Sequence, residues 1–259
     1  MISDMTDYPL LAIFVISLTV ILGTAEIGRR LGLRAAGKGG DNITTLEGAI
    51  LGLLALMISF TFAMALSRFE ARRDAVLAEA NAIGTTALRA RLLAEPEGAE
   101  VLRLLRRYVQ LRLDMIERLP SAPEFNADTT RAGELQNALW RQAQAAAAKD
   151  NAMVPTGLFI QSLNEMIDDL EKQLTATRNR VPNIVLLALY GIAAVASAFT
   201  GYAGGLESRR SRLPVHIMGL LVSAVILLIQ DLDRPTAGFI RVSQQPMIDA
   251  AASIAAHGE

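Results

Sequence analysis

The chain has no cysteine, only two histidines and few aromatic residues, which make up 5% of its 259 positions. Without cysteine it can form neither a disulfide framework nor a thiolate metal site. The histidines, His216 and His257, are far apart in the sequence, so we expect no histidine metal centre. The formal net charge is −1, which leaves no basic footprint for nucleic acid.

Catalytic motifs are also missing. The sequence offers no nucleophile–base pair, no glycine-rich phosphate loop and no metalloprotease motif. We therefore expect neither an enzyme nor a bound cofactor, and assign no metal site. The weak candidates for a metal are Asp231 and Asp233, whose carboxylates could share a hard cation or could equally pair with Arg234.

Apolar sequence is abundant and is gathered into four long runs. Hydrophobic residues make up 52% of the chain, although 20% of it is charged. The runs are residues 8–27, 48–66, 182–202 and 213–229. A bilayer core about 30 Å thick needs roughly 20 helical residues, so each run predicts a transmembrane helix. Residues 1–7 contain two aspartates and no basic residue, so we expect the first run to be retained rather than cleaved.

The fold class that follows is an all-α integral membrane protein with four spans and a helical insert between spans 2 and 3. We divide the chain into a first transmembrane hairpin (1–66), a soluble helical domain (67–181), a second hairpin (182–235) and a C-terminal tail (236–259). Sixteen basic and sixteen acidic residues in 67–180, without strand-like alternation, indicate a neutral helical surface.

The insert is predicted to form a four-helix bundle whose outer helices continue spans 2 and 3. Its helices are expected to be divided at Pro96, at a loop over 121–126 and at 151–156. Apolar residues spaced by three and four predict the buried faces of two helices. In the second helix these are Val101, Leu102, Leu105, Val109, Leu113 and Ile116, and in the fourth they are Leu163, Met166, Ile167, Leu170 and Leu174.

The stretch FTFAMALSRFEARRDAVLAEANAIGT (residues 60–85) passes from apolar to charged sequence with nothing that breaks a helix. It predicts one rod that leaves the membrane without a turn. In a symmetric oligomer an aromatic ring from this span would form an apolar constriction, with hydroxyl contacts beside it. The candidates for a pore or gate are Met57, Ser59, Phe60, Thr61, Phe62 and Met64. Alternatively the span is lipid-facing or packed, and its hydroxyls bond to carbonyls four residues earlier.

Charged and polar residues follow this span. Arg68, Arg72 and Arg73 could form a vestibule that concentrates anions or lipid headgroups, or could anchor the helix at the interface beside Glu70 and Asp74. A polar layer of Glu79, Asn81 and Thr85 could hold a ligand or fix the register of packed helices.

Small residues recur every four positions in span 3. Ala193, Ser197, Gly201 and Gly205 form a row that lets another helix approach closely. Gly48 and Gly52 make a shorter row on span 2.

Two segments resemble the bacterial bestrophin-like family. They are LGLLALMISFTFAMALSRFEARRDAVLAEANAIGTTALRARLL (residues 51–93) and DLDRPTAGFIRVSQQPM (residues 231–247). The resemblance implies a channel, because bestrophins are oligomeric anion channels whose second span lines the pore and continues beyond the membrane. The chain shares the exit in which aromatic residues precede arginines, but lacks the Trp-Trp pair that follows it in bestrophins.

We therefore expect a homo-oligomeric channel of the bacterial inner membrane for small inorganic ions such as anions, surrounded by the lipid bilayer. The alternative is a non-conducting membrane-anchored helical sensor or scaffold. Seven basic residues in the short connections favour an extracytoplasmic helical domain, whereas arginines bordering the insert favour a cytoplasmic one.

Overall fold

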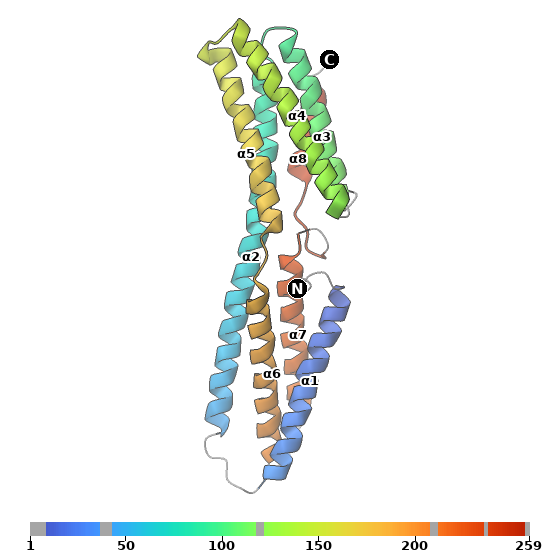
Figure 1. The fold of residues 1–259 in the computed structure, drawn as a ribbon. Coiled ribbons are helices and arrows are strands. Elements are labelled where there is room, and N and C mark those ends of the chain that lie inside the picture. The colour runs from blue at the N-terminus through green and yellow to red at the C-terminus, as the bar shows by residue number, and fades with distance from the viewer. Residues whose placement is uncertain (1–8, 37–42, 118–121, 208–211, 236–237, 257–259) are drawn as a thin grey trace. The chain divides into compact units, whose positions relative to one another are not determined.

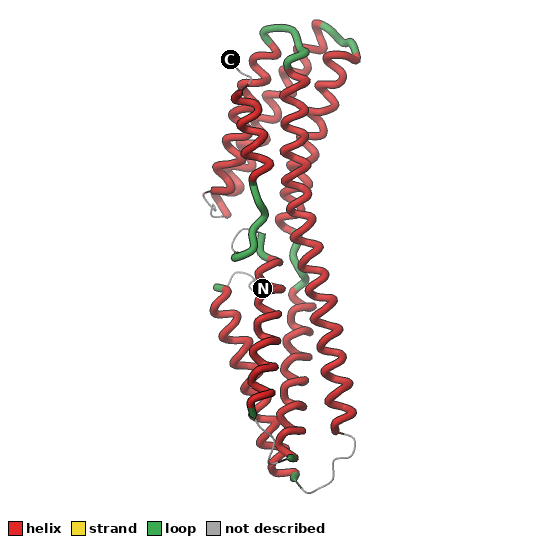
Figure 2. The backbone as a smooth tube through the Cα atoms, turned by 180° about the vertical axis from the view of Figure 1, so that it is seen from behind, coloured by secondary structure: helices red, strands yellow, loops and turns green. Residues whose placement is uncertain are grey.

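The computed structural model describes residues 9–36, 43–117, 122–207, 212–235 and 238–256. Within these ranges the chain consists of helices and their connections, without strands (Figures 1 and 2). It divides into two compact units, of which the first contains Met1–Phe69, Arg180–Arg234 and Gly238–Ile240. Three of the seven basic residues in the short connections, Lys38, Arg209 and Arg210, lie outside the described ranges, and so does His257.

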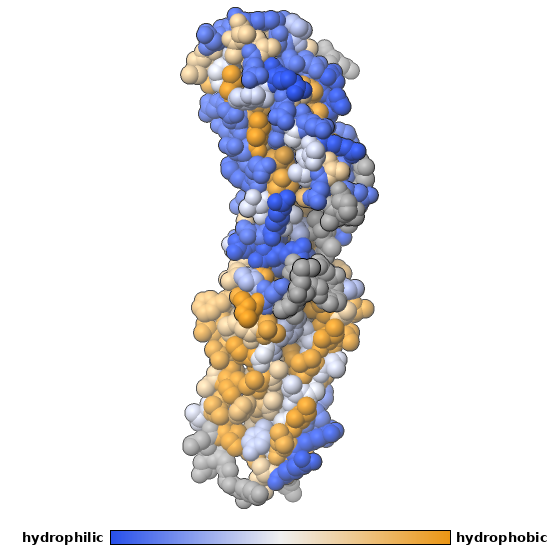
Figure 3. Space-filling model, viewed as in Figure 1, coloured by the Kyte–Doolittle hydropathy of each residue, from blue (hydrophilic) through white to orange (hydrophobic). Residues whose placement is uncertain are grey.

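The first unit contains the four predicted spans. They are α1 (Leu10–Ala35), the first part of α2 (Ile43–Ala90), α6 (Asn183–Leu206) and α7 (Leu213–Asp233), and all are long and apolar enough to cross a membrane. The prediction of four spanning helices is therefore confirmed. α1 packs along α6 and α7 (Figure 1). The face of this unit seen in Figure 3 is mainly hydrophobic, as contact with lipid requires.

The second unit contains the rest of α2 together with α3 (Glu97–Glu117), α4 (Ala122–Lys149), α5 (Leu158–Arg178) and α8 (Gln245–Ala256). A π-helical turn, Met153–Gly157, joins α4 to α5. Of the five residues predicted for the buried face of α5, Leu163, Met166, Leu170 and Leu174 are buried in one apolar core, and Ile167 is partly buried against it. The surface of this unit is mainly hydrophilic (Figure 3).

α2 is one uninterrupted helix of 48 residues. At 1.5 Å per residue it is about 70 Å long, more than twice the thickness of a bilayer core. It contains no proline, and Ala, Leu, Arg and Glu, which form helices well, fill most of its second half. The predicted continuous rod is confirmed.

The expected continuity between the insert and span 3 is wrong. The helix is interrupted between α5 and α6, where Asn179 and Pro182 have the non-helical ψ values 116° and 133°. Proline disfavours a helical conformation of the residue before it, here Val181. The backbone N–H of Val181 instead donates to Oδ1 of Asp233 at 2.9 Å, so the interruption leaves this buried amide hydrogen-bonded.

Other details of the second unit also differ from prediction. Residues 122–126, expected in a loop, belong to α4, while Ser121 lies outside the described residues. The C-terminal tail, to which no helix was assigned, contains α8, which packs against α3. Its buried residues Met247, Ala250 and Ile254 are spaced by three and four. This periodicity is the sequence pattern that predicts a helix there.

The buried face of α3 is rotated from the predicted stripe. Val101, Leu105 and Val109 are buried as expected, but Leu102 and Leu113 are only partly buried. Leu104, Tyr108, Arg112 and Met115 are buried as well. α3 packs against both α4 and α8, and its Tyr108 and Arg112 donate hydrogen bonds to Glu79 of α2, so more than one stripe of α3 is buried.

Candidate functional site: the exposed face of α2

One face of α2 in the spanning unit is not covered by any other described part of the chain. It consists largely of small residues, with Gly52, Ser59, Ala63 and Ser67 following one another at helical spacing. Four large side chains share the exposed sector, namely Leu46, Leu53, Leu56 and Phe60. This face is therefore shallow and carries hydroxyl groups, with one aromatic ring projecting from it.

The exposed residues of the other spans are different. α1, α6 and α7 present mainly large aliphatic side chains, including Leu11, Val15, Ile16, Ile184, Leu187, Ile217, Leu220 and Leu221. Long apolar side chains suit contact with lipid tails, whereas small residues suit the close approach of another helix. The face of α2 thus has the composition of a helix–helix contact or of a lining.

The two candidate aromatic residues are separated by the structure. Phe60 is 63% exposed, whereas Phe62 packs against the core of the spanning unit. Met57 and Met64 are also half-buried in that core. Of the residues proposed for a gate, Phe60 is thus the large side chain that projects from the open face.

The two hydroxyl groups bond to the helix itself. Ser59 Oγ donates to the carbonyl oxygen of Ala55 at 2.9 Å, and Thr61 Oγ1 donates to that of Met57 at 2.7 Å. This is the alternative arrangement that the sequence left open. Thr61 is fully buried, whereas Ser59 is exposed and keeps acceptor capacity toward water.

The three arginines that follow the span do not share one exposed face. Arg72 is buried, at 4% exposure, and Arg68 is half-buried. Arg73 is exposed and pairs with the carboxylate of Asp74, its Nη2 lying 3.2 Å from Oδ1. Continuing from Ser67 by steps of three and four, the exposed face of α2 reaches Glu70 and Asp74. Its ionisable groups are thus two carboxylates, one of them neutralised by Arg73.

Farther along α2, only Glu79 of the three polar-layer candidates enters a polar cluster. Its carboxylate is fully buried, and Arg112 donates to it from Nε at 2.8 Å and from Nη2 at 3.0 Å. Tyr108 Oη donates to the same carboxylate at 2.8 Å. Burial, followed by the charge of Glu79, raises the pKa of Tyr108 well above its ordinary value of 10.0. Asn81 is exposed and Thr85 half-exposed, so the chain by itself assembles no layer from these three residues.

The small-residue row on α6 lies against α1. Ala193, Ser197, Gly201 and Gly205 are all buried. A Cβ atom on Gly201 would collide with the backbone carbonyl oxygen of Ala25. The partner row on α1, formed by Ala25, Gly28 and Gly32, was not singled out from the sequence, although its spacing in AEIGRRLG was a sufficient signal.

The shorter row on α2 meets no other helix among the described residues. Gly48 and Gly52 lie on the open face, and a Cβ atom added at either would have no heavy atom of another described residue within 4 Å. This row is therefore available for contact with lipid or with a second copy.

Asp231 and Asp233 are engaged with backbone amides. Asp231 Oδ1 accepts from the N–H of Phe239 at 2.8 Å and Oδ2 from that of Ile240 at 2.9 Å, while Asp233 accepts from Val181. Both carboxylates therefore fix the loops that follow α7 and precede α6. No group of three or more potential metal ligands occurs in the described part of the chain.

Comparison with known proteins places these features in a family. The fold is that of a multi-pass helical membrane protein. A family model for the bestrophin-like domain matches residues 13–247, and the chain belongs to the bestrophin-like family. The fold also matches the crystal structure of a bacterial bestrophin homologue from Klebsiella pneumoniae, with a TM-score of 0.66, 13% identity, and coverage of 96% of this chain and 98% of that one. A point mutant of that homologue matches with a TM-score of 0.64, again at 13% identity, with coverage of 96% and 100%. A search of curated proteins gave no match.

Proposed function

We propose that the protein is a homo-oligomeric ion channel of the bacterial inner membrane, in which the exposed face of α2 lines the conduction path. The contrast between this shallow face and the aliphatic faces of the other three spans carries the proposal. Copies related by a symmetry axis would bring these small residues and hydroxyls around one path. Membership of the bestrophin-like family, whose characterised members are ion channels, supports it.

Phe60 is the constriction in this proposal. Its aromatic side chain projects from the shallow part of α2. In a symmetric oligomer each copy would therefore place one apolar side chain at the same level of the path. Such a constriction resists wetting and can gate a pore without a moving lid. Phe62 has no such role, because it packs among the helices of its own chain.

The charge along α2 favours cations over anions at the exit. Glu70 and Asp74 continue the exposed face, whereas Arg72 is turned into the protein. Arg73 offsets one carboxylate per copy through its ion pair with Asp74, which leaves about one negative charge on this face. A ring of carboxylates attracts cations and repels anions, so the anion vestibule expected from the arginines is replaced by a cation-attracting one.

Two alanine substitutions test the constriction. In planar bilayers Phe60→Ala is expected to raise single-channel conductance, because a smaller side chain eases hydration of the pore. Phe62→Ala is the matched control and is expected to leave open-pore conductance unchanged. Equal increases in both variants would place the path on a different face of α2.

Water access tests the lining separately from conduction. Because the chain has no cysteine, Ala63→Cys on α2 and Ala224→Cys on α7 place single thiols at exposed alanines of two spans. A membrane-impermeant charged thiol reagent is expected to modify the first and spare the second, which would face lipid. If neither thiol is modified and the reconstituted protein carries no ion flux, the results favour the alternative, a non-conducting helical scaffold.

Selectivity tests the charge argument. In a salt gradient the reversal potential is expected to indicate cation preference, and Glu70→Gln is expected to reduce that preference. Anion preference in the unaltered protein would refute the assignment of the acidic face to the path.

A further inference from the structure

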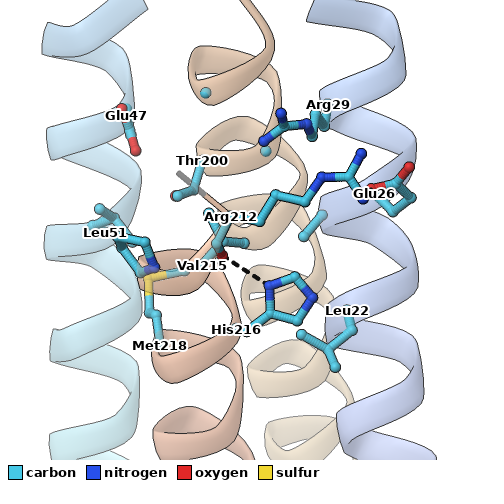
Figure 4. A pocket seen from close by; sticks show the side chains of 14 residues that line it. Leu22, Glu26, Arg29, Glu47, Leu51, Thr200, Arg212, Val215, His216 and Met218 are labelled. Atoms are coloured by element: carbon cyan, nitrogen blue, oxygen red, sulfur yellow. Dashed lines mark hydrogen bonds and ion pairs between the residues drawn. The ribbon is translucent and has the colours of Figure 1, made fainter. Parts of the chain in front are cut away.

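The spanning unit contains a pocket of about 270 Å³ near its inter-helix connections, between α1, α2, α6 and α7 (Figure 4). α1 contributes Glu26 and Arg29, the N-terminal end of α7 contributes Arg212, and α2 contributes Glu47. Such a volume lies just below the usual range of small-molecule sites and suits a compact polar group. The channel proposal assigns no role to this pocket.

Charge is distributed unevenly around the pocket. Arg29 and Arg212 lie on the same side as Glu26, and Glu47 projects from the opposite wall (Figure 4). Glu26 is an acceptor for Arg30 at 3.1 Å and lies 3.9 Å from Arg212. The wall formed by α1 and α7 thus brings two guanidinium groups, those of Arg29 and Arg212, to the pocket, while the α2 wall carries the negative charge of Glu47. A zwitterion with separated charges complements this arrangement.

Polarity also changes with depth along the helices. Arg29, Glu47 and Arg212 lie nearer the connecting loops, whereas Leu22, Leu51 and Met218 line the pocket farther along their helices. Figure 4 shows Glu47 and Arg29 at one level and Leu22 and Met218 at the other, where His216 also lies with its Nδ1 2.8 Å from the carbonyl oxygen of Arg212. A pocket that is charged at one end and apolar at the other matches an amphiphile rather than a small soluble ion.

We propose that this pocket binds the headgroup of a zwitterionic phospholipid, with the phosphate between Arg29 and Arg212 and the ammonium group at Glu47. Arginine binds phosphate through paired charge-assisted hydrogen bonds, and a carboxylate is the matching partner of a primary ammonium group. Leu22, Leu51 and Met218 contact the beginning of the acyl chains. The inference requires the membrane-embedded fold but not ion conduction.

The experiment measures lipid binding to the whole protein. Delipidated protein is titrated with short-chain phosphatidylethanolamine or phosphatidylglycerol, and bound lipid is counted by native mass spectrometry. The unaltered protein is expected to bind phosphatidylethanolamine more tightly. Arg29→Gln with Arg212→Gln is expected to weaken both lipids about ten- to hundredfold, the usual range for lost charge-assisted hydrogen bonds.

Two further variants make the result specific. Glu47→Gln is expected to abolish the preference for the ethanolamine headgroup while leaving phosphatidylglycerol affinity unchanged. Arg34→Gln is the matched control, because Arg34 lies on the same helix as Arg29, is exposed and does not line the pocket; its affinities are expected to stay unchanged. Melting temperatures without lipid, and the headgroup preference of Glu47→Gln, separate lost binding from lost folding.

Three results would overturn the proposal. The first is equal affinity of the unaltered protein for both lipids. The second is an equal effect of the paired-arginine variant and the Arg34→Gln control. The third is equally tight binding of glycerophosphoethanolamine, which has no acyl chains, because the ligand would then be a soluble zwitterion rather than a membrane lipid.

Discussion

A single methyl group added at Gly201 should separate two membrane helices. A Cβ atom there would overlap the carbonyl oxygen of Ala25 and its neighbouring backbone atoms, which cannot rotate away as a side chain can. α1 and α6 must therefore move apart or shift along each other. Overpacking of this kind costs about 1–3 kcal/mol. Gly201→Leu adds more volume at the same point and is expected to cost more and to disturb assembly.

Gly191 provides a matched control on the same helix. It is exposed, and a Cβ atom added there would have no heavy atom of another described residue within 4 Å. Replacing a mid-helix glycine by alanine without a clash favours the helix by roughly 0.5–1 kcal/mol. The two Gly→Ala variants are thus expected to change stability in opposite directions and to differ by about 1.5–4 kcal/mol.

The assay is unfolding in mixed micelles of increasing denaturing detergent, followed by helical circular dichroism. Tryptophan fluorescence would not report on this contact, because the single tryptophan, Trp140, belongs to the second unit. If Gly201→Ala stabilises the protein as much as Gly191→Ala, the backbones of α1 and α6 are not in contact and the argument fails.

The remaining predictions concern the helical unit. Arg112→Met is expected to cost about 3–5 kcal/mol, because it leaves the buried carboxylate of Glu79 without its guanidinium. Leu163→Ala is expected to cost about 2–5 kcal/mol by opening a cavity in the core. The hydrogen bond from Lys149, whose Nζ lies 2.7 Å from the carboxylate of Glu97, lowers the pKa of Glu97 below 4.5. A lowered folded-state pKa means that this pair stabilises the unit fully above the unfolded value and loses its effect as pH falls through the folded value.

Each of these predictions has a control and a contrary result. Arg106→Gln and Leu92→Ala change exposed residues and are expected to have little effect on chemical denaturation. If Arg112→Met costs no more stability than Arg106→Gln, the buried pair does not stabilise the unit. If Leu163→Ala costs no more than Leu92→Ala, Leu163 does not contribute to the core. For Glu97, melting temperatures from about pH 6 to about pH 3 are expected to fall less in Lys149→Met than in the unaltered protein. An unchanged acid-side slope would contradict the pair's contribution.

The sequence by itself determined the helical class, the four spans and the rod. Runs of about 20 apolar residues fix spanning helices because the bilayer sets their length, and α2 continues because nothing in it breaks a helix. The α5 core and the small-residue row on α6 also followed from spacing, since residues three or four apart share one face.

Tertiary structure decided which face of each element is covered, because that depends on neighbours that spacing does not identify. The sequence does not distinguish Phe60 from Phe62, yet Phe62 is partly buried against the core of the spanning unit and Phe60 is exposed. The sequence alone indicates that Arg112 is a surface residue, but in the structure it is buried and bonds to Glu79, 33 positions away. The pocket lined by Arg29, Arg212 and Glu47 likewise depends on tertiary structure. These residues come from separate helices, so their side chains line one pocket only when the chain folds.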